Sequence, residues 1–170
     1  GSEMCIRDRP YEMLSALPES ARKRFYDMAV FDYDEFAALF DASPKKNLVI
    51  IGTSHGSEES ARQQRDYVAR IVEQYGEGYD IFFKPHPADT SSAGYETEFP
   101  GLTLLPGQMP FEIFVWALID RVDMIGGYPS TVFLTVPLDK VRFIFAANAE
   151  SMARPLNILF RDATDVEWMQ

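Results

Sequence analysis

The sequence has a single cysteine and no long apolar run. Cys5 has no second cysteine to pair with inside the chain, so the fold cannot depend on an internal disulfide, and we expect a cytoplasmic protein. The most apolar stretch, residues 111–118, is too short to cross a bilayer, and the first residues show no apolar signal-peptide region. The sequence therefore predicts a soluble domain.

Basic residues are also scarce. The chain carries 16 of them against 26 acidic ones, for a formal net charge of -10, which disfavours DNA or RNA as a partner because the phosphate backbone would be repelled. A small anionic ligand would have to be attracted by local features such as helix N-termini. With 170 residues, 46% hydrophobic and 25% charged, the chain has the size and composition of one globular domain, and we expect one core.

We expect three segments along the chain. Residues 1–9 contain the string MCIRDR, which looks like a translated sequencing adapter, so we predict an artefactual leader and a truncated N-terminus; an ordinary charged tail is the alternative. Residues 10–45 read as a helical linker with one or two helices, ending in a Ser-Pro-Lys-Lys break. Residues 46–170 are predicted to form a Rossmann-like domain.

Strand and helix signals alternate in that last segment. Apolar runs predict strands, helical spacing predicts a helix, and prolines at 110 and 129 predict two further helix starts. The final segment, 157–170, is expected to hold a short strand followed by a helix. This alternation predicts an α/β fold with a doubly wound parallel sheet. The expected strands are residues 47–51, 79–83, 102–105, 122–125 and 141–145, and the first helix is 58–75.

The turn Lys84-Pro85-His86-Pro87 follows the second predicted strand. Ligands of open α/β sheets bind beyond the carboxyl ends of the strands, and the two prolines restrict the directions of both polar side chains. An imidazole, with a pKa near ~6.5, can give a proton to a leaving phosphate, and Lys84 adds positive charge beside it. The alternative is a structural turn histidine. We favour a functional one because the chain has two histidines in all.

Two other predicted helix starts carry polar side chains. Ser130 and Thr131 follow a Gly-Gly turn and a proline, which places two hydroxyls and free backbone N–H groups where a phosphate can bind; a plain Ser/Thr cap is the alternative. Glu112 lies in a first helical turn, where it can accept two ribose hydroxyl bonds or simply interact with the helix dipole.

The loop after the first predicted strand contains Thr53, Ser54 and His55. This loop faces the same crevice, so its polar side chains are candidates for contact with a phosphate or an acceptor sugar. An ordinary polar loop explains them equally well.

Taken in order, Gly-Thr-Ser, Lys-x-His-Pro, Phe-Glu and Gly-x-x-Ser-Thr resemble the C-terminal half of the bacterial CMP-sialic-acid sialyltransferases, over residues 48–146 and including Gln63 and Gln64. These are two-domain GT-B enzymes, so the resemblance implies one half of a GT-B fold. It implies a CMP-sugar donor and a glycan acceptor, with sialic acid transferred from CMP-sialic acid to the acceptor hydroxyl with inversion. It implies no cofactor and no metal, and products such as lipooligosaccharide or capsule glycans.

The resemblance also implies roles for individual residues. His86 would contact the CMP phosphate and act as general acid, Lys84 would lie against the cytidine, and Glu112 would hold the ribose hydroxyls. Ser130 and Thr131 match a paired-serine phosphate motif, with threonine in place of the second serine. Pro85 replaces the glycine of one sialyltransferase group, and Gly56 lies near the place where some members have an acceptor-binding tryptophan.

The general base of the family is an aspartate in an Asp-Gly motif of the N-terminal domain, and this sequence contains no such motif. Asp32, Asp34 and Glu35 lie in the predicted linker and are not expected to replace it, so the chain alone is predicted to be inactive. Peripheral association of the full-length enzyme with the inner face of the bacterial membrane is left open. The alternatives are a GT-B enzyme with another nucleotide-sugar donor and a nucleotide-binding domain without catalysis.

Overall fold

The computed structural model describes residues 16–28, 31–109 and 111–170 of the chain. The predicted leader, residues 1–9, lies outside these residues, and so does Pro110, which we expected to begin a helix. The predicted division into linker and binding domain near residue 45 stays a prediction.

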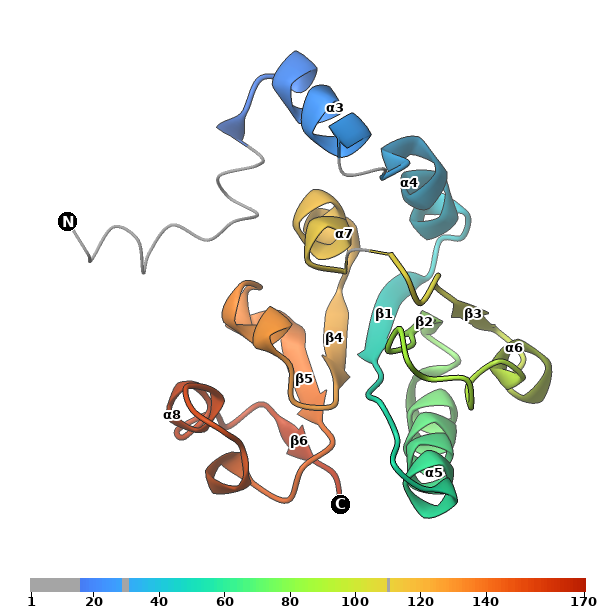
Figure 1. Ribbon diagram of the computed structural model, residues 1–170, viewed down its shortest axis with the longest axis vertical. Helices are drawn as coiled ribbons and strands as arrows, with labels where there is room; N and C mark the ends of the chain where they lie inside the picture. Colours follow the sequence, from blue (N-terminus) through green and yellow to red (C-terminus); the bar gives the residue numbers. More distant parts are fainter. Residues whose placement is uncertain (1–15, 29–30, 110) are drawn as a thin grey trace.

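The described residues form an open sheet of six parallel strands in the order β3-β2-β1-β4-β5-β6 (Figure 1). This is the order of doubly wound, Rossmann-like folds, so the predicted fold class is confirmed. Each expected apolar run forms a strand, although the fourth strand begins two residues later than its apolar run. The strands are β1 (Lys46–Ile51), β2 (Tyr79–Lys84), β3 (Leu102–Leu104), β4 (Met124–Gly127), β5 (Val141–Ile144) and β6 (Glu167–Trp168).

The strand β1 is apolar from Leu48 to Ile51 because both of its faces are covered there. Successive side chains of a strand point to opposite faces. Leu48 and Ile50 therefore pack with the helix α5 (Glu58–Tyr75), whereas Val49 and Ile51 belong to a second cluster on the other face. That second cluster includes α4 (Tyr33–Asp41) and α7 (Phe111–Leu118), which Figure 1 shows across the sheet from α5.

Two helices, α3 (Glu19–Met28) and α4, occupy the described part of the N-terminal region, as its apolar spacing predicts. Phe40 of α4 stacks on Phe82 of β2, with ring centroids 4.3 Å apart, so this region packs against the same core as the sheet. No helix of the described residues is both long and apolar enough to span a membrane. The remaining helices are α6 (Tyr95–Glu98), α8 (Leu156–Leu159), and the 3-10 turns η1 (Ile119–Arg121), η2 (Thr131–Leu134), η3 (Leu138–Lys140) and η4 (Ala149–Ser151).

Two sequence predictions are wrong in detail. The helix expected from Pro129 is the single 3-10 turn η2, because Pro137 cannot continue a helix and instead precedes the second short turn, η3. The final segment has the reverse of the expected order, with the helix α8 before the strand β6. Leu156 and Phe160, four residues apart, are both buried in the core, which is helical and not strand spacing.

Candidate functional site

The candidate site is a cavity of about 470 Å³ where the carboxyl ends of β1 and β4 meet. The chain continues from β1 toward β2 on one side and from β4 toward β5 on the other, so this is the switch point at which doubly wound sheets bind ligands. Four segments that are distant in sequence line the cavity. They contribute Ile51, Gly52 and Thr53; Lys84, Pro85, His86 and Pro87; Gln108, Met109, Phe111 and Glu112; and Pro129, Ser130 and Val132.

The structure brings most of the predicted site residues together, but not all of them. Ser54, His55 and Thr131 do not line the cavity, and Ser54 and Thr131 are exposed. The other predicted residues line it, and these are Thr53, Lys84, Pro85, His86, Glu112 and Ser130.

A glycine fixes the close approach of β4 to β1 beside the cavity. Gly127 has φ +122, which side-chain-bearing residues rarely adopt, and a Cβ there would overlap the backbone of Ile51. The chain then leaves β4 with the Tyr128 N–H donating to the Ile51 carbonyl oxygen at 3.0 Å. This places the segment that contains Ser130 next to Gly52 and Thr53.

Lys84, the last residue of β2, is a buried cation at the wall of the cavity, with only 4% of its surface exposed. Its Nζ donates to the carbonyl oxygens of Pro85 at 2.7 Å and Gly107 at 2.8 Å, which connects the turn after β2 to the segment that leads to α7. Burial lowers the pKa of Lys84 to about 8, and the nearby Glu112 carboxylate acts against this shift. A lysine with this pKa is mostly charged at neutral pH and loses its charge at mildly basic pH.

His86 is exposed, and the turn around it is held by several hydrogen bonds. Its Nδ1 accepts from the Ala88 N–H at 3.1 Å, and its carbonyl oxygen accepts from the Asp89 N–H at 2.9 Å. Gln108 holds the same turn from the other side, donating to the Pro87 carbonyl oxygen at 3.1 Å. Because Nδ1 accepts a hydrogen bond, this ring is neutral and carries its hydrogen on Nε2, which is then the donor available to a ligand.

The hydroxyl of Ser130 makes the bond that a helix cap makes. Its Oγ accepts from the Val132 N–H at 3.2 Å, at the start of η2. The hydroxyl keeps its own hydrogen to donate, so capping and ligand binding are compatible. Glu112 is exposed in the first turn of α7, and its carboxylate is the one negative charge among the described residues that line the cavity.

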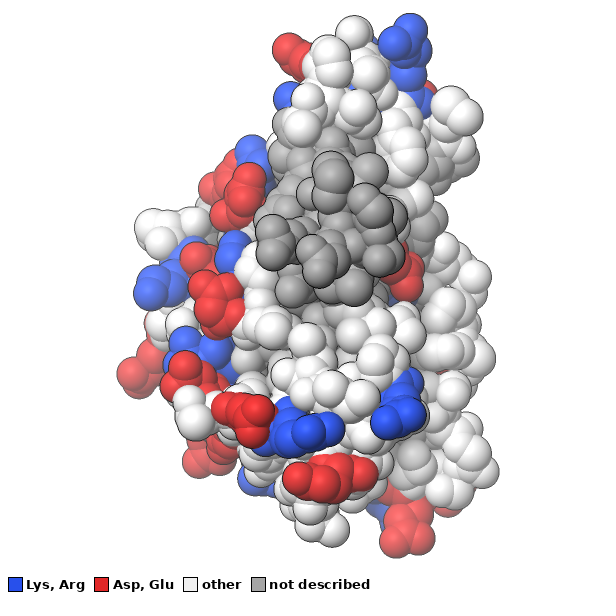
Figure 2. Space-filling view, turned by 90° about the vertical axis from the view of Figure 1, so that its left-hand side faces the viewer, with Lys and Arg blue, Asp and Glu red and all other residues white. Residues whose placement is uncertain are grey.

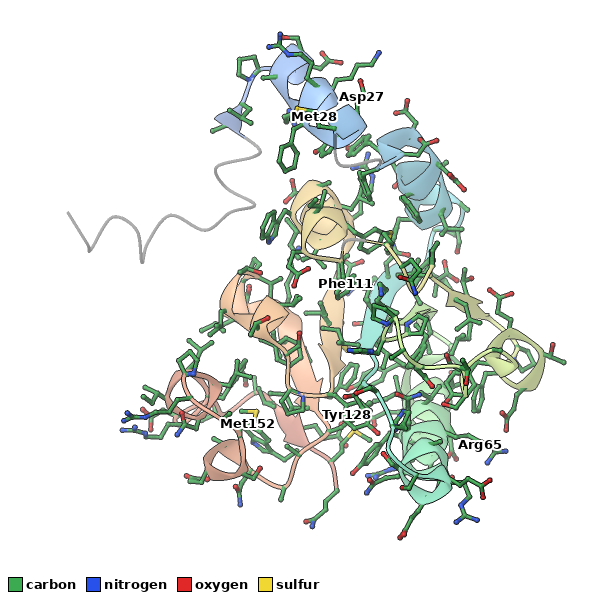
Figure 3. All side chains as sticks on the ribbon, in the orientation of Figure 1. Asp27, Met28, Arg65, Phe111, Tyr128 and Met152 are labelled. Carbon is green, nitrogen blue, oxygen red and sulfur yellow. The ribbon has the colours of Figure 1, made fainter. Side chains whose placement is uncertain are left out.

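His55 lies in a different environment from His86. Its Nδ1 is 2.7 Å from Ser60 Oγ in the first turn of α5, and its ring meets the Tyr128 ring edge-on with centroids 6.2 Å apart. Tyr128 packs on the cluster that faces α5, whereas the cavity residue Phe111 belongs to the opposite cluster (both are labelled in Figure 3). His55 is therefore held on the α5 side of the sheet.

The amide of Gln64 contacts the site, although the sequence predicts no functional role for this residue. Gln64 is fully buried, and it lies in α5 on the same face as Tyr67, Val68 and Ile71. It bonds to the backbone of the cavity residue Thr53 and to Asp89, just beyond the His86 turn. The sequence does carry a signal for this buried amide: Gln64 is a polar residue at a position where the three- and four-residue spacing of the helix predicts an apolar one.

No family model matches the sequence, and no curated protein matches it. Solved structures do match. A sialyltransferase from Photobacterium damsela is 25% identical over 92% of this chain and 38% of its own, with a TM-score of 0.73. The GT-B domain of a Photobacterium damselae sialyltransferase is 22% identical over 92% of this chain and 46% of its own, with a TM-score of 0.72. A Photobacterium 2,6-sialyltransferase, solved with CMP and lactose, is 21% identical over 93% of this chain and 36% of its own, with a TM-score of 0.69.

These similarities confirm the predicted resemblance to bacterial sialyltransferases and the GT-B type of fold. They favour this family over the alternative of a nucleotide-binding domain without catalysis. The chain spans less than half the length of each of these three structures.

Proposed function

We propose that the chain is the donor-binding domain of a sialyltransferase, with CMP-sialic acid in the cavity at the ends of β1, β2 and β4. One observation carries the proposal: segments with sialyltransferase-like motifs, from four separate parts of the chain, line a single cavity. The Photobacterium 2,6-sialyltransferase, which has a similar fold and was solved with CMP and lactose, supports a CMP donor and a glycan acceptor.

In this proposal each polar group at the cavity has a part of the donor to bind. The Nε2–H of His86 donates to the phosphate, and Ser130 adds a hydroxyl donor from another segment of the lining. Lys84 lies against the cytidine and adds positive charge in a chain that is otherwise acidic. The Glu112 carboxylate accepts from the ribose hydroxyls.

The transfer step breaks the bond between the anomeric carbon of sialic acid and the phosphate oxygen of CMP. The bonding electrons stay on that oxygen, while the acceptor hydroxyl forms its bond to the opposite face of the carbon and loses its proton to a base. A protonated His86 can give its Nε2 proton to the departing phosphate. An imidazolium carries hydrogen on both nitrogens, so this state gives up the bond that Nδ1 accepts from Ala88.

We also propose that donor binding needs no metal ion or other cofactor. The buried Lys84 ammonium supplies positive charge at the cavity, and the His86 ring and the Ser130 hydroxyl supply the hydrogen-bond donors for the phosphate. CMP affinity measured with and without a chelator should then be the same.

Calorimetry with CMP, UMP and GMP tests the proposal on the chain itself. We expect CMP to bind at least about tenfold more tightly than the other two, which corresponds to a difference of about 1.4 kcal/mol. Equal affinity for CMP and UMP would indicate another nucleotide-sugar donor. Failure of a folded sample to bind any of the three would refute the donor site.

A further inference from the structure

Gln64 is a buried amide between the α5 helix and two segments next to the cavity. None of its surface is exposed, whereas its neighbour Arg65 lies on the solvent side of α5 (Figure 3). An amide in such a place is stable only if its hydrogen bonds are made, because burying it without partners is costly. Its partners therefore show what this residue holds in place.

Both ends of the amide are used. Oε1 accepts from the Thr53 N–H at 3.2 Å, and Nε2 donates to Asp89 Oδ2 at 3.1 Å and to the Tyr95 hydroxyl at 3.2 Å. Thr53 lines the cavity, and the Asp89 N–H donates to the His86 carbonyl oxygen at 2.9 Å. One side chain thus links the loop after β1 to the turn that contains His86.

Asp89 is a suitable anchor because it is held as an anion. Burial raises the pKa of its carboxyl, but the bonds from the Ser91 hydroxyl and N–H, the bond from Gln64 and the nearby His55 together lower the pKa below its usual value. The Ser91 bonds to Oδ1 are 2.6 and 2.8 Å long and leave Oδ2 for Gln64. A charged acceptor makes the bond from the amide stronger than a neutral one would.

We propose that Gln64 is a positioning residue for the donor phosphate, which holds Thr53 and the His86 turn at the separation that the phosphate requires. This inference rests on the proposed function of the cavity. The role needs an acceptor and two donors on one side chain, which glutamine has. Leucine offers neither, and glutamate offers no donor and would place a second carboxylate against Asp89.

Exchanging the hydrogen-bond donor and acceptor between positions 64 and 89 tests this geometry. In Gln64→Glu, the new carboxylate keeps the bond from Thr53 but repels Asp89. In the double variant Gln64→Glu with Asp89→Asn, the side-chain amide introduced at position 89 donates to the new carboxylate and still accepts from Ser91. The bond from Thr53 is therefore kept. The bond between positions 64 and 89 is also kept, but position 89 is now its donor. Gln63→Glu is the matched control, because it places the same charge on the exposed face of the same helix turn.

The measured quantities are the affinities for CMP and cytidine and the melting temperature of each variant. We expect Gln64→Glu to weaken CMP binding about tenfold or more, a loss of about 1.4 kcal/mol. Cytidine binding should change by less than about twofold, and the double variant should recover CMP affinity to within about threefold of the wild type. Gln63→Glu should resemble the wild type. A merely structural role would weaken both ligands together.

The outcomes separate this inference from the proposed function. If the wild type does not bind CMP, the donor site itself is refuted. If it does, and Gln64→Glu binds CMP as tightly as Gln63→Glu, or if CMP and cytidine lose affinity equally, the positioning role is refuted. Should Gln64→Glu fail to fold, Asp89→Ala decides in its place: this change at a half-buried turn removes the anchor, and CMP affinity equal to the wild type would overturn the proposal.

Discussion

The two histidines of the chain differ in what their ring nitrogens contact. His86 presents Nε2 at the cavity because Nδ1 accepts from the backbone, whereas His55 is held by Ser60 and Tyr128 on the α5 side. Both follow predicted strands, but the sequence favours a functional role for His86 alone. The difference in environment leads to a direct comparison of two alanine variants.

We expect His86→Ala to weaken CMP binding about tenfold or more, because a hydrogen bond to a charged group is worth ~1.5–3 kcal/mol. His55→Ala should change it by less than about twofold. Calorimetry with CMP measures both. In a two-domain enzyme the same His86 change should also lower kcat by ~10² to 10⁴, the usual scale for a positioned general acid. Normal CMP affinity and normal turnover would instead make His86 a structural turn residue.

The pKa of Lys84 predicts how donor binding depends on pH. In the free chain Lys84 loses its proton near pH 8, while a bound phosphate favours its charged form, so binding above that pH requires uptake of a proton. CMP affinity should therefore fall as the pH rises from about 7.5 to 9.5, roughly tenfold in all. The CMP phosphate itself, with a second pKa near ~6, stays fully charged over this range.

Calorimetry at several pH values measures this effect, and Lys84→Met is the control. The variant should bind CMP more weakly at pH 7.5 and lose most of the pH dependence. A wild-type affinity that is constant over the range, or that rises with pH, would show that Lys84 does not interact with the donor charge.

At the scale of secondary-structure elements, the strands β1 to β5 are the most predictable feature because each contains an apolar run near turn residues. The site followed from the strands, since parallel strands bring their carboxyl ends to one edge. The lengths of the later elements were not predictable in the same way. Pro129 indicates a helix start, but the element that follows is the four-residue 3-10 turn η2.

The same limit explains the residues that the sequence reasoning misplaced or missed. Thr131 follows Ser130 directly, yet it is exposed and outside the cavity lining because a tight 3-10 turn directs neighbouring side chains apart. Gln64 bonds to residues that are 11, 25 and 31 positions away, which no local pattern reveals. Long-range polar contacts of this kind need the folded structure.

The η2 turn supports a prediction about the Ser130 hydroxyl. We expect Ser130→Ala with Thr131→Val to weaken CMP binding by ~1–3 kcal/mol, because the hydrogen bond that Ser130 donates to a charged phosphate is worth about this much. Cytidine, which has no phosphate, should bind as before. Equal losses for both ligands would mean that the Ser130 bond to Val132 is a cap whose loss disturbs the turn, and the phosphate role would be wrong.

For the molecule as a whole, the net charge of -10 argues for a local and not a global attraction to an anionic donor. On the face shown in Figure 2, Lys and Arg side chains are interspersed with Asp and Glu and form no continuous basic patch among the residues that the structure describes. The absence of a nucleic-acid partner stays a prediction. The buried Lys84 and the hydrogen-bond donors of the cavity are then the features on which donor binding depends.

The last prediction concerns catalysis by the 170-residue chain alone: we expect it to bind CMP but not to transfer sialic acid. In a GT-B enzyme the donor and acceptor meet between two domains, and inversion needs a base at the attacking hydroxyl. Among the described residues that line the cavity, Glu112 is the single carboxylate, and it is proposed to bind ribose. Asp32 instead caps α4, accepting from the Glu35 N–H at 3.0 Å.

The assay supplies CMP-sialic acid and lactose and measures sialylated product, with the Photobacterium enzyme that was solved with CMP and lactose as the positive control. CMP titration of the same sample shows that the donor site is intact. Transfer by the chain at a rate near that of the control would mean that a base is present in these residues. Glu112→Gln would then be the first variant to measure, because a base must reach the cavity, followed by Asp32→Asn, Asp34→Asn and Glu35→Gln. Loss of transfer with retained CMP binding in one of them would identify that residue.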